Sequence, residues 1–295
     1  MTDLQFPTSL GISTPDTITL LGRDLPSQLL GKISFGELAY QLITLRPPSR
    51  GQAHVFEAVL VALADHGFTP TAIAARLTYL SAPDAIQGAL AAGLLGGGSR
   101  FLGVSEDTGE FLAETLATID TLPVDDAGWD ALATAAVEGR RDAGAYVPGL
   151  GHHLHKSGDP RTAVIIEIAR EEGQYGPHLA LFEAVGRIAP VVLGRSLPLN
   201  GAGACGAALA DVGIPLGLLR GVVLLARCAG LDKALAQFPD DVAAAAAQAE
   251  GVAKRVNGPI DPVAEPWPPM RVGGCSLPYP PPGAAAGSVG PGAGR

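Results

Sequence analysis

Half of the histidines of this chain lie in one short segment. The stretch VPGLGHHLHKSGDPR, residues 147–161, contains three of the six histidines together with Lys156 and Arg161. The PGLG turn leaves backbone N–H groups available to an anion in front of His152, and the two basic side chains add positive charge there. An imidazole, with a pKa of about 6.5, donates and accepts protons at neutral pH. The segment therefore predicts a site that holds a carbonyl or alcohol beside carboxylates and transfers a proton.

A metal site is the first alternative, because histidine is the commonest ligand of transition metals. No cysteine or acidic residue follows His152, His153 and His155 at a useful spacing, and no two histidines are spaced i, i+4 for one face of a helix. The sequence therefore favours a site without a metal. The second alternative is that the three histidines face solvent in an exposed loop.

The composition argues against several classes of partner. The chain of 295 residues is 47% hydrophobic but only 5% aromatic, and its apolar content is mostly Ala, Leu and Val, which favours closely packed helices. An excess of 29 acidic over 20 basic side chains gives a net charge of −9. This charge argues against nucleic acid or an anionic membrane as the main partner.

The location of the protein is predicted from three features. The three cysteines are far apart and form no zinc-type pair, which favours a reducing compartment. Residues 1–16 lack the basic and apolar regions of a secretory signal. The most apolar run, residues 213–231, is interrupted by Arg220 and Arg227, so it predicts a buried helix rather than a membrane span. We therefore expect a cytoplasmic protein.

Helical periodicity continues along most of the chain as far as residue 238. Ser34, with Glu37 three positions later, predicts a capping box, and Asp159 before Pro160 predicts another helix start. Helices are expected over 34–45, 52–66, 69–80, 82–95, 105–122, 129–144, 159–173, 178–194 and 215–238. A short β segment is expected over 18–25, and a Gly-rich turn over 196–206. His66 would then lie at the C-terminal end of a helix.

The chain is expected to divide into one folded domain and a tail. Residues 1–256 are predicted to form a helical domain, with a smaller subdomain over roughly 105–210. Residues 257–295 are rich in Pro, Gly and Ala without periodicity, so we expect this tail to be disordered.

Several segments resemble, in order, those of the citrate synthase superfamily. Residues 147–161 are similar to the family's Gly-x-Gly-His turn followed by Asp-Pro-Arg. Further similar blocks are GKISFGELAYQLI and RPPS (31–49), LVALADHGFTPTAIAARL (60–77), AIQGALAAGLLGGGSRFLG (85–103), LPLNGAGACGAALADVGIP (197–215) and GVVLLARCAGL (221–231). The resemblance covers roughly residues 15–237. It implies an all-α, citrate-synthase-like fold with a large and a smaller helical domain and the ligand between them.

The resemblance also implies roles for individual residues. His66 and His152 would contact the keto or hydroxyl oxygen of an oxaloacetate-like unit, and His152 would transfer its proton. Arg161 and Arg227 would hold the carboxylates of this unit, with Asn200 as a further substrate-binding residue. The CoA arm would be lined by Val147, Pro148, Gly149, Leu150, Gly151 and Lys156. As alternatives, Arg227 would extend from a core helix to solvent, and His66 would cap the carbonyls of its helix.

Two departures from the family pattern concern the acetyl half of the reaction. Leu102 stands where citrate synthases have the histidine that stabilises the enol of acetyl-CoA, as in the citryl-CoA lyase modules, including the citrate-synthase-like part of ATP citrate lyase. Ala202 stands where the family has the carboxylate that moves the proton at the acetyl carbon. The chain is also short between RPPS and the ADHG helix, again as in those lyases. The departures favour cleavage over synthesis.

The predicted function is therefore that of a citryl-CoA-lyase-like enzyme, which cleaves citryl-CoA or a close homologue to acetyl-CoA and oxaloacetate. One alternative is a condensing acyltransferase of the citrate synthase or methylcitrate synthase type. Another is a non-catalytic subunit that binds a dicarboxylate or CoA, since Ala202 carries no carboxylate. The resemblance implies at least a homodimer and a CoA thioester as substrate, with no bound cofactor. The basic C-terminal feature with which family members complete a neighbouring subunit's site is not evident here.

Overall fold

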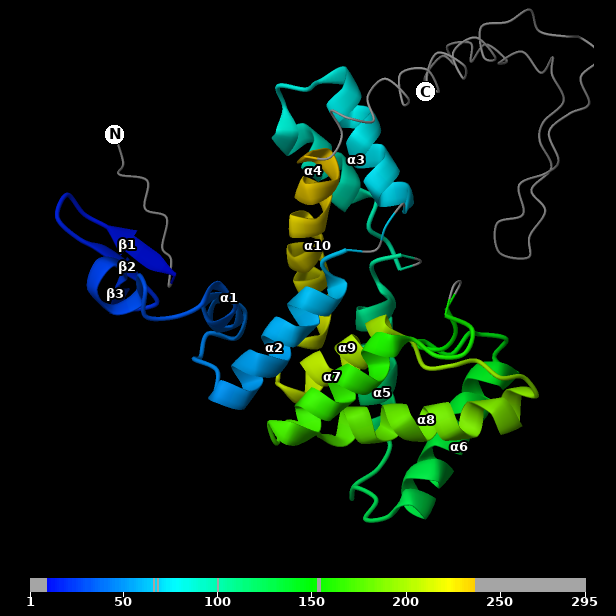
Figure 1. Cartoon of the computed structure of the whole chain (residues 1–295). Helices are drawn as coiled ribbons and strands as arrows, with labels where there is room; N and C mark the ends of the chain where they lie inside the picture. The colour runs from blue at the N-terminus through cyan, green and yellow to red at the C-terminus, as the bar shows by residue number, and fades with distance from the viewer. Residues whose placement is uncertain (1–9, 66, 68, 100, 153–154, 237–295) are drawn as a thin grey trace, which may run out of the picture. The chain divides into compact units, whose positions relative to one another are not determined.

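A small antiparallel sheet precedes a series of helices in the described part of the chain (Figure 1). The structure is a computed structural model that describes residues 10–65, 67, 69–99, 101–152 and 155–236. The sheet has the order β1 (Gly11–Ser13), β2 (Ile18–Leu20), β3 (Arg23–Asp24) and leads into a helical turn, η1 (Leu25–Leu29). The later elements are α1 (Phe35–Thr44), α2 (Arg50–Leu63), α3 (Pro70–Ser81), α4 (Ile86–Leu95), α5 (Val104–Leu116), α6 (Asp126–Asp142), α7 (Pro160–Glu171), α8 (Pro177–Leu193), α9 (Gly201–Asp211), η2 (Leu216–Leu218) and α10 (Leu219–Ala236). The predicted all-α class and the short β segment are confirmed.

The predicted helix starts are confirmed at α1 and α7. Ser34 Oγ accepts the N–H of Glu37 at 3.0 Å, and the Glu37 carboxylate accepts the N–H of Ser34 at 2.7 Å. At α7, the Asp159 side chain accepts the N–H of Arg161 at 3.1 Å, and Pro160 is the first helical residue. Because an N-cap contributes about 1 kcal/mol to a helix, these starts follow from local sequence.

The prediction of a Gly-rich turn over 196–206 is wrong from Gly201 onward, where α9 begins. The glycines of α9 allow close packing. A Cβ atom on Gly203 would lie 2.6 Å from the Cα of Gly149, and one on Gly206 would overlap the carbonyl oxygen of Ser105. These positions exclude a side chain because other segments approach the helix backbone, not because the chain turns there.

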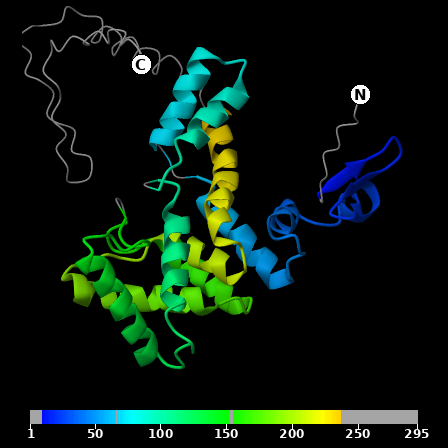
Figure 2. The ribbon, with the colours of Figure 1, turned by 180° about the vertical axis from the view of Figure 1, so that it is seen from behind.

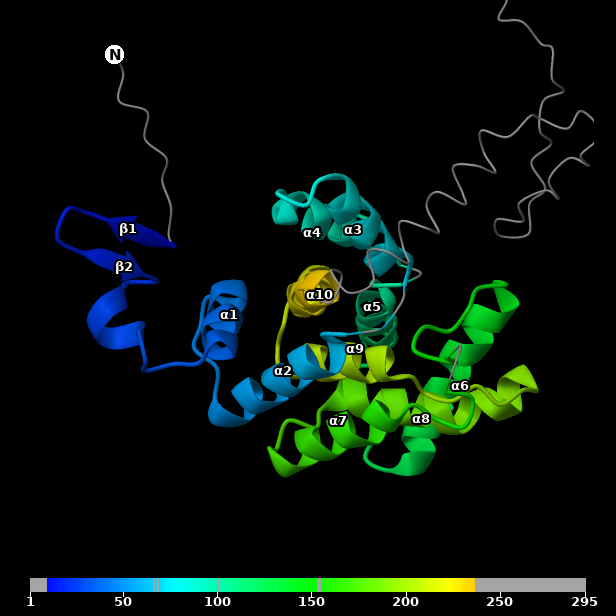
Figure 3. The ribbon, with the colours of Figure 1, turned by 45° about the horizontal axis from the view of Figure 1, so that its top comes forward.

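Helix α9 lies among several other helices. It packs against α2, α5, α7 and α8, and Figure 3 shows it between them. Its residues from Ala204 to Leu209 are fully buried in the main hydrophobic core, to which Phe56, Leu112 and Phe182 also belong. The first turn of α9 is therefore held from several sides.

Helix α10 connects this core with a second, smaller one. It extends from the region of α9 to α3 and α4 (Figure 2). Val222 and Val223 belong to the main core, whereas Leu231 and Leu235 pack with Ala72, Ala75 and Ala89 of α3 and α4. Arg227 lies between these two apolar sections of α10, so the helix brings a charged residue into the interior.

The domain predictions concern residues that the structure describes only in part. Contacts group residues 1–240 in one unit and 241–295 in another, and the second unit, with the predicted tail, lies outside the described residues. The smaller subdomain over 105–210 stays a prediction. Among the described helices, none has the length and apolar character needed to cross a membrane.

Candidate active site

The predicted CoA-binding turn at residues 147–151 is held against the segment before α9. The N–H of Gly151 donates to Pro198 O at 2.7 Å, and the N–H of Asn200 donates to Gly149 O at 2.9 Å. Gly149 has φ +80°, and a Cβ atom there would lie 2.6 Å from the Phe182 ring, so this position needs glycine. The turn is therefore fixed in place relative to the start of α9.

Asn200 joins this turn to α9 through its side chain. It is buried; its Oδ1 accepts the N–H of Gly203 at 2.8 Å, and its Nδ2 donates to Gly151 O at 2.9 Å. It is thus the N-cap of α9 as well as a brace for the turn that precedes His152. Its predicted contact with substrate stays a prediction.

The ring of His152 is oriented by a backbone group. Its Nδ1 accepts the N–H of His155 at 3.1 Å, and its Nε2 atom is buried. Because Nδ1 accepts a hydrogen bond, the neutral ring carries its hydrogen on Nε2, an assignment that follows from the hydrogen-bond pattern. His152 therefore donates at Nε2 in this arrangement. The predicted role of accepting a proton there requires the other tautomer, without the bond from His155.

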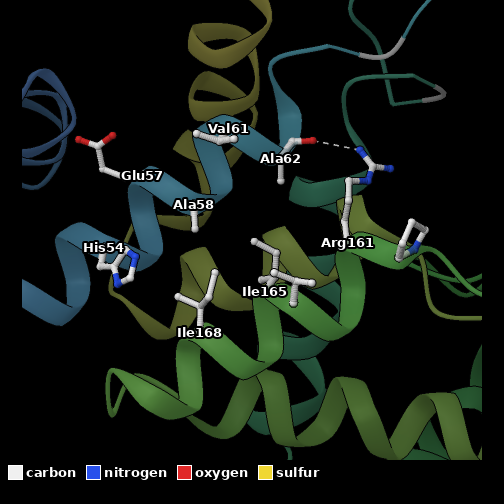
Figure 4. Close-up of a pocket in the computed structure, with 10 residues that line it drawn as sticks. His54, Glu57, Ala58, Val61, Ala62, Arg161, Ile165 and Ile168 are labelled. Atoms are coloured by element: carbon white, nitrogen blue, oxygen red, sulfur yellow. Dashed lines mark hydrogen bonds between the residues drawn. The ribbon is translucent and has the colours of Figure 1, made fainter.

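Arg161 forms a partly buried ion pair with Asp159 and also reaches α2. Its Nε and Nη2 donate to the two carboxylate oxygens of Asp159 at 3.0 and 2.7 Å, and its Nη1 donates to Ala62 O at 3.0 Å, the bond drawn in Figure 4. Asp159 also accepts the N–H of Gly201 at 2.9 Å. Of the five guanidinium hydrogens, one on each terminal nitrogen remains for another acceptor.

The Asp159 carboxylate stays ionised because of these contacts. Burial by itself raises the pKa of Asp159, but hydrogen bonds from the Arg161 guanidinium and from the N–H groups of Gly201 and Arg161 outweigh it. They hold the pKa of this carboxyl well below its ordinary value. The sequence predicts Asp159 only as a helix cap. Its ion pair with Arg161 is not predicted, although the Asp-Pro-Arg spacing is a signal from which this pair could be inferred.

Arg227 is a buried cation. Its residue is only 4% exposed, and its Nε has no hydrogen-bond partner among the described residues. Burial lowers the pKa of the Arg227 guanidinium, the negative charge of Asp65 opposes this shift, and the positive charge of Arg161 adds to it. The alternative that Arg227 extends to solvent is wrong, since the side chain is enclosed. Two guanidinium groups thus lie close enough to repel each other, which favours an anion beside them.

His66 lies outside the described residues, but the segment before it is described. Gly230 of α10 lies so close to this segment that a Cβ atom on it would overlap Ala64 O. The N–H of Gly67 donates to Asp65 Oδ1 at 3.1 Å. The end of α2 is thus held against α10, one turn from Arg227, and against Arg161 through Ala62.

The two departures from the family pattern carry no ionisable group. Leu102 is buried at 3% exposure. Ala202 lies in the first turn of α9, where its carbonyl oxygen accepts the Ser105 hydroxyl at 2.7 Å. Burial raises the pKa of the nearby Cys205 thiol to about 12, so this thiol stays protonated at neutral pH.

The remaining predicted residues differ in accessibility. Val147, Pro148 and Gly149 are buried, Leu150 and Gly151 are half-buried, and Lys156 is exposed in a turn. Their predicted contact with CoA stays a prediction. The described residues contain no group of three or more His, Cys, Asp or Glu side chains placed to hold a metal ion.

An apolar cavity of about 520 Å³ lies between α2 and α7, with His54 and Arg161 at its ends (Figure 4). Its walls include Ala58, Val61 and Ala62 of α2 and Val164, Ile165 and Ile168 of α7. Val61 is 76% exposed and Val164 52% exposed. Apolar side chains exposed together in this way are typical of a surface that a partner covers.

Comparisons with known proteins match most of the described chain. The family model of the citrate synthase C-terminal domain matches residues 25–237. A curated relative, the citrate synthase of Deinococcus radiodurans, is 26% identical over 230 residues, which are 75% of this chain and 56% of that protein. This chain therefore spans only about half the length of that relative.

Solved structures with the same fold include two lyases. Citryl-CoA lyase from Hydrogenobacter thermophilus matches with a TM-score of 0.70 and 28% identity over 79% of this chain and 86% of its own. ATP citrate lyase from Methanothrix soehngenii, solved in complex with citrate and coenzyme A, matches with a TM-score of 0.69 and 22% identity over 81% of this chain and 40% of its own. At 22% identity the second match concerns the fold alone.

Proposed function

Since the chain belongs to the citrate synthase family, we propose that it is an enzyme that cleaves citryl-CoA, or a close homologue, to acetyl-CoA and oxaloacetate. The observation that carries this proposal is the buried Arg227 guanidinium beside Arg161. A guanidinium pairs well with a carboxylate, and burial strengthens that pairing because water competes less. The two groups would hold the carboxylates of the oxaloacetate half.

His152 would act on the oxygen of the same half. In cleavage, the bond between the carbinol carbon and the methylene carbon of the thioester breaks, its electron pair forms a thioester enolate, and the carbinol oxygen becomes a ketone. The Nε2–H of His152 would donate to this oxygen as it becomes negative. For the oxygen to become negative, the alcohol must first lose its proton to another group, for which His66 is the remaining predicted residue.

The direction of the reaction is inferred from the acetyl half. The enolate formed by cleavage must gain a proton, and solvent is able to supply it. Condensation instead requires a base at a weakly acidic carbon, and Ala202 and Leu102 offer none. Losing a positioned acid or base typically lowers a rate by about 10²–10⁴. Cleavage of citryl-CoA should therefore be easier to detect than citrate formation.

The proposal includes a CoA site, a homodimer and a cytoplasmic location. The CoA arm would lie along the turn at 147–151, with Lys156 nearby. The exposed apolar side chains of α2 and α7 around the cavity of Figure 4 support a second copy of the chain as the partner on this face.

A condensing acyltransferase is the second candidate, and the match to a citrate synthase favours it. A non-catalytic subunit is the third, and Ala202 favours it. The deciding experiment offers synthetic citryl-CoA to the full chain and couples released oxaloacetate to NADH oxidation. The His152→Ala variant is measured alongside.

Each outcome of this assay supports one of the three candidate functions. Turnover that falls at least about 10²-fold in the variant supports the lyase. Efficient citrate formation from acetyl-CoA and oxaloacetate, with slower cleavage, would support the synthase instead. Folded protein that binds oxaloacetate or CoA without turnover would support the binding subunit.

A further inference from the structure

The ring of His155 lies against the ring of His152. The two ring centroids are 4.5 Å apart, and the ring planes are inclined by 31°. Both residues are half-buried. The function proposed above uses His152 but gives His155 no role, although the sequence places both in the same short segment.

His155 contacts His152 in two ways, through its backbone and through its side chain. The backbone N–H of His155 donates to Nδ1 of His152 at 3.1 Å, which sets the nitrogen that carries the hydrogen. The side chain of His155 covers one face of the same ring, which restricts its rotation about the Cβ–Cγ bond. The first contact depends on the second, because a rotated ring would turn Nδ1 away from the N–H group.

His155 is itself held by the chain that follows it. The N–H of Gly158 donates to His155 O at 3.4 Å and closes a turn. Asp159 comes next, and its buried carboxylate is bonded to Arg161 and to the N–H of Gly201. The position of His155 is therefore tied to the same carboxylate that orients Arg161.

We propose that His155 is a positioning residue, whose stacked ring and backbone N–H together hold His152 with its Nε2–H directed at the substrate oxygen. The effect on cleavage rests on the proposed function. The effect on the tautomer and orientation of His152 does not, since it is a property of the protein without substrate. The two are therefore tested by separate measurements.

The first measurement is nitrogen NMR of the uniformly 15N-labelled full chain. It detects the coupling across the hydrogen bond between the His155 amide nitrogen and Nδ1 of His152, with His152→Ala identifying the ring signals. We compare the wild type with His155→Leu, which keeps the N–H but removes the flat ring, and with His155→Phe, which keeps a flat ring. Thermal melting shows that each variant is folded.

We expect the coupling in the wild type and in His155→Phe. In His155→Leu the coupling should be lost. The 15N chemical shifts of the His152 ring should then move toward those of the tautomer mixture of an unconstrained imidazole. A wild type without the coupling, or a folded His155→Leu variant that retains it, would overturn the proposal.

The second measurement follows citryl-CoA cleavage. His155→Leu is expected to lower kcat about tenfold, part of the 10²–10⁴ that a positioned group contributes, with KM within about twofold of the wild type and with recovery in His155→Phe. Lack of cleavage by the wild type, with the NMR result as expected, would refute the proposed substrate and leave the positioning role established. A variant that loses the coupling yet keeps full kcat would overturn the catalytic part.

Discussion

At the scale of single residues, charge in the candidate site is arranged in two ways. The Arg161–Asp159 pair is satisfied within the chain, since both carboxylate oxygens and three guanidinium hydrogens are bonded. Arg227 is buried with its Nε lacking a partner among the described residues. Asp159 and Arg161 thus stabilise the fold, whereas burial of the Arg227 charge opposes folding, as expected for a group with the ligand-binding role proposed above.

Replacing Arg227 separates stability from binding. In Arg227→Met, an apolar chain of similar length takes the place of a buried cation, so the melting temperature should equal or exceed that of the wild type. Oxaloacetate binding, measured by calorimetry, should fall at least tenfold. Since Arg161→Met leaves Asp159 buried without its partner, that variant should melt lower. An Arg227→Met variant that melts well below the wild type would show that the guanidinium is structural.

Asp159→Asn should destabilise the chain, unlike Arg227→Met. Removing the charge that pairs with Arg161 should lower the free energy of unfolding by about 3 kcal/mol, the lower end for a buried pair, since the Arg161 side chain is 26% exposed. Urea unfolding at pH 7 measures this change. The matched control is Asp142→Asn, whose pair with Arg141 is exposed and should contribute less than about 1 kcal/mol.

The pH dependence of this difference has a defined sign. The pKa of Asp159 is depressed in the folded chain, so its stabilising effect is complete above its ordinary pKa of about 3.9 and is lost as pH falls through the lower, folded value. The wild type should therefore keep its advantage over Asp159→Asn from pH 8 to about pH 4 and lose it only below. An advantage that fades already between pH 7 and pH 5 would contradict a depressed pKa.

At the scale of elements, α9 decides the geometry of the site. Its first residues receive Asn200 as N-cap and the Asp159 carboxylate at the N–H of Gly201. Its glycines let the 147–151 turn and α5 approach its backbone. A helix with three glycines in its first two turns has poor intrinsic propensity, so tertiary packing must stabilise it.

A pair of glycine substitutions tests this account. Alanine at Gly206 of α9 should destabilise the chain by about 1–3 kcal/mol, because its Cβ would overlap Ser105 O and force a helix to shift. Alanine at Gly139 of α6, where nothing lies within 4 Å, should stabilise it by about 0.5–1 kcal/mol through helix propensity. Chemical unfolding of both variants measures the two effects. Equal changes of the same sign would refute close packing at α9.

At the scale of the whole molecule, the exposed apolar face of α2 and α7 is the surface on which we propose that a second copy of the chain binds. The cavity on this face shares Ala62 and Arg161 with the candidate site (Figure 4). A second copy covering it would therefore lie next to the groups that hold the end of α2. In the homodimer proposed above, the interface between the two copies would therefore be adjacent to the candidate site.

Charge placed on this face should dissociate the homodimer. We expect the wild type to sediment as a dimer or larger, and Val61→Glu with Val164→Glu to sediment as a monomer, because a buried interface does not accommodate unpaired carboxylates. The control is Val124→Glu, at a site 97% exposed and distant in sequence from both helices. Sedimentation velocity distinguishes the species. A monomeric wild type would refute the homodimer.

The helical class, the capped starts at Ser34 and Asp159 and the segment that carries His152 can all be predicted from the sequence alone. These properties depend on residues a few positions apart, so periodicity and caps suffice to predict them. The family resemblance added Arg161 and Arg227 as partners in one site. This role stays a prediction, and the resemblance gave no contacts for either side chain.

The partners of these groups follow from tertiary packing alone. The burial of Arg227, the bond from Arg161 to Ala62, the helix that begins at Gly201 and the hydrogen on Nε2 of His152 all depend on which segments pack together. Such contacts join residues far apart in the chain or backbone groups whose direction the side-chain pattern does not encode. Local propensities fix elements, whereas desolvation and hydrogen bonding between elements assign each charged group its partner.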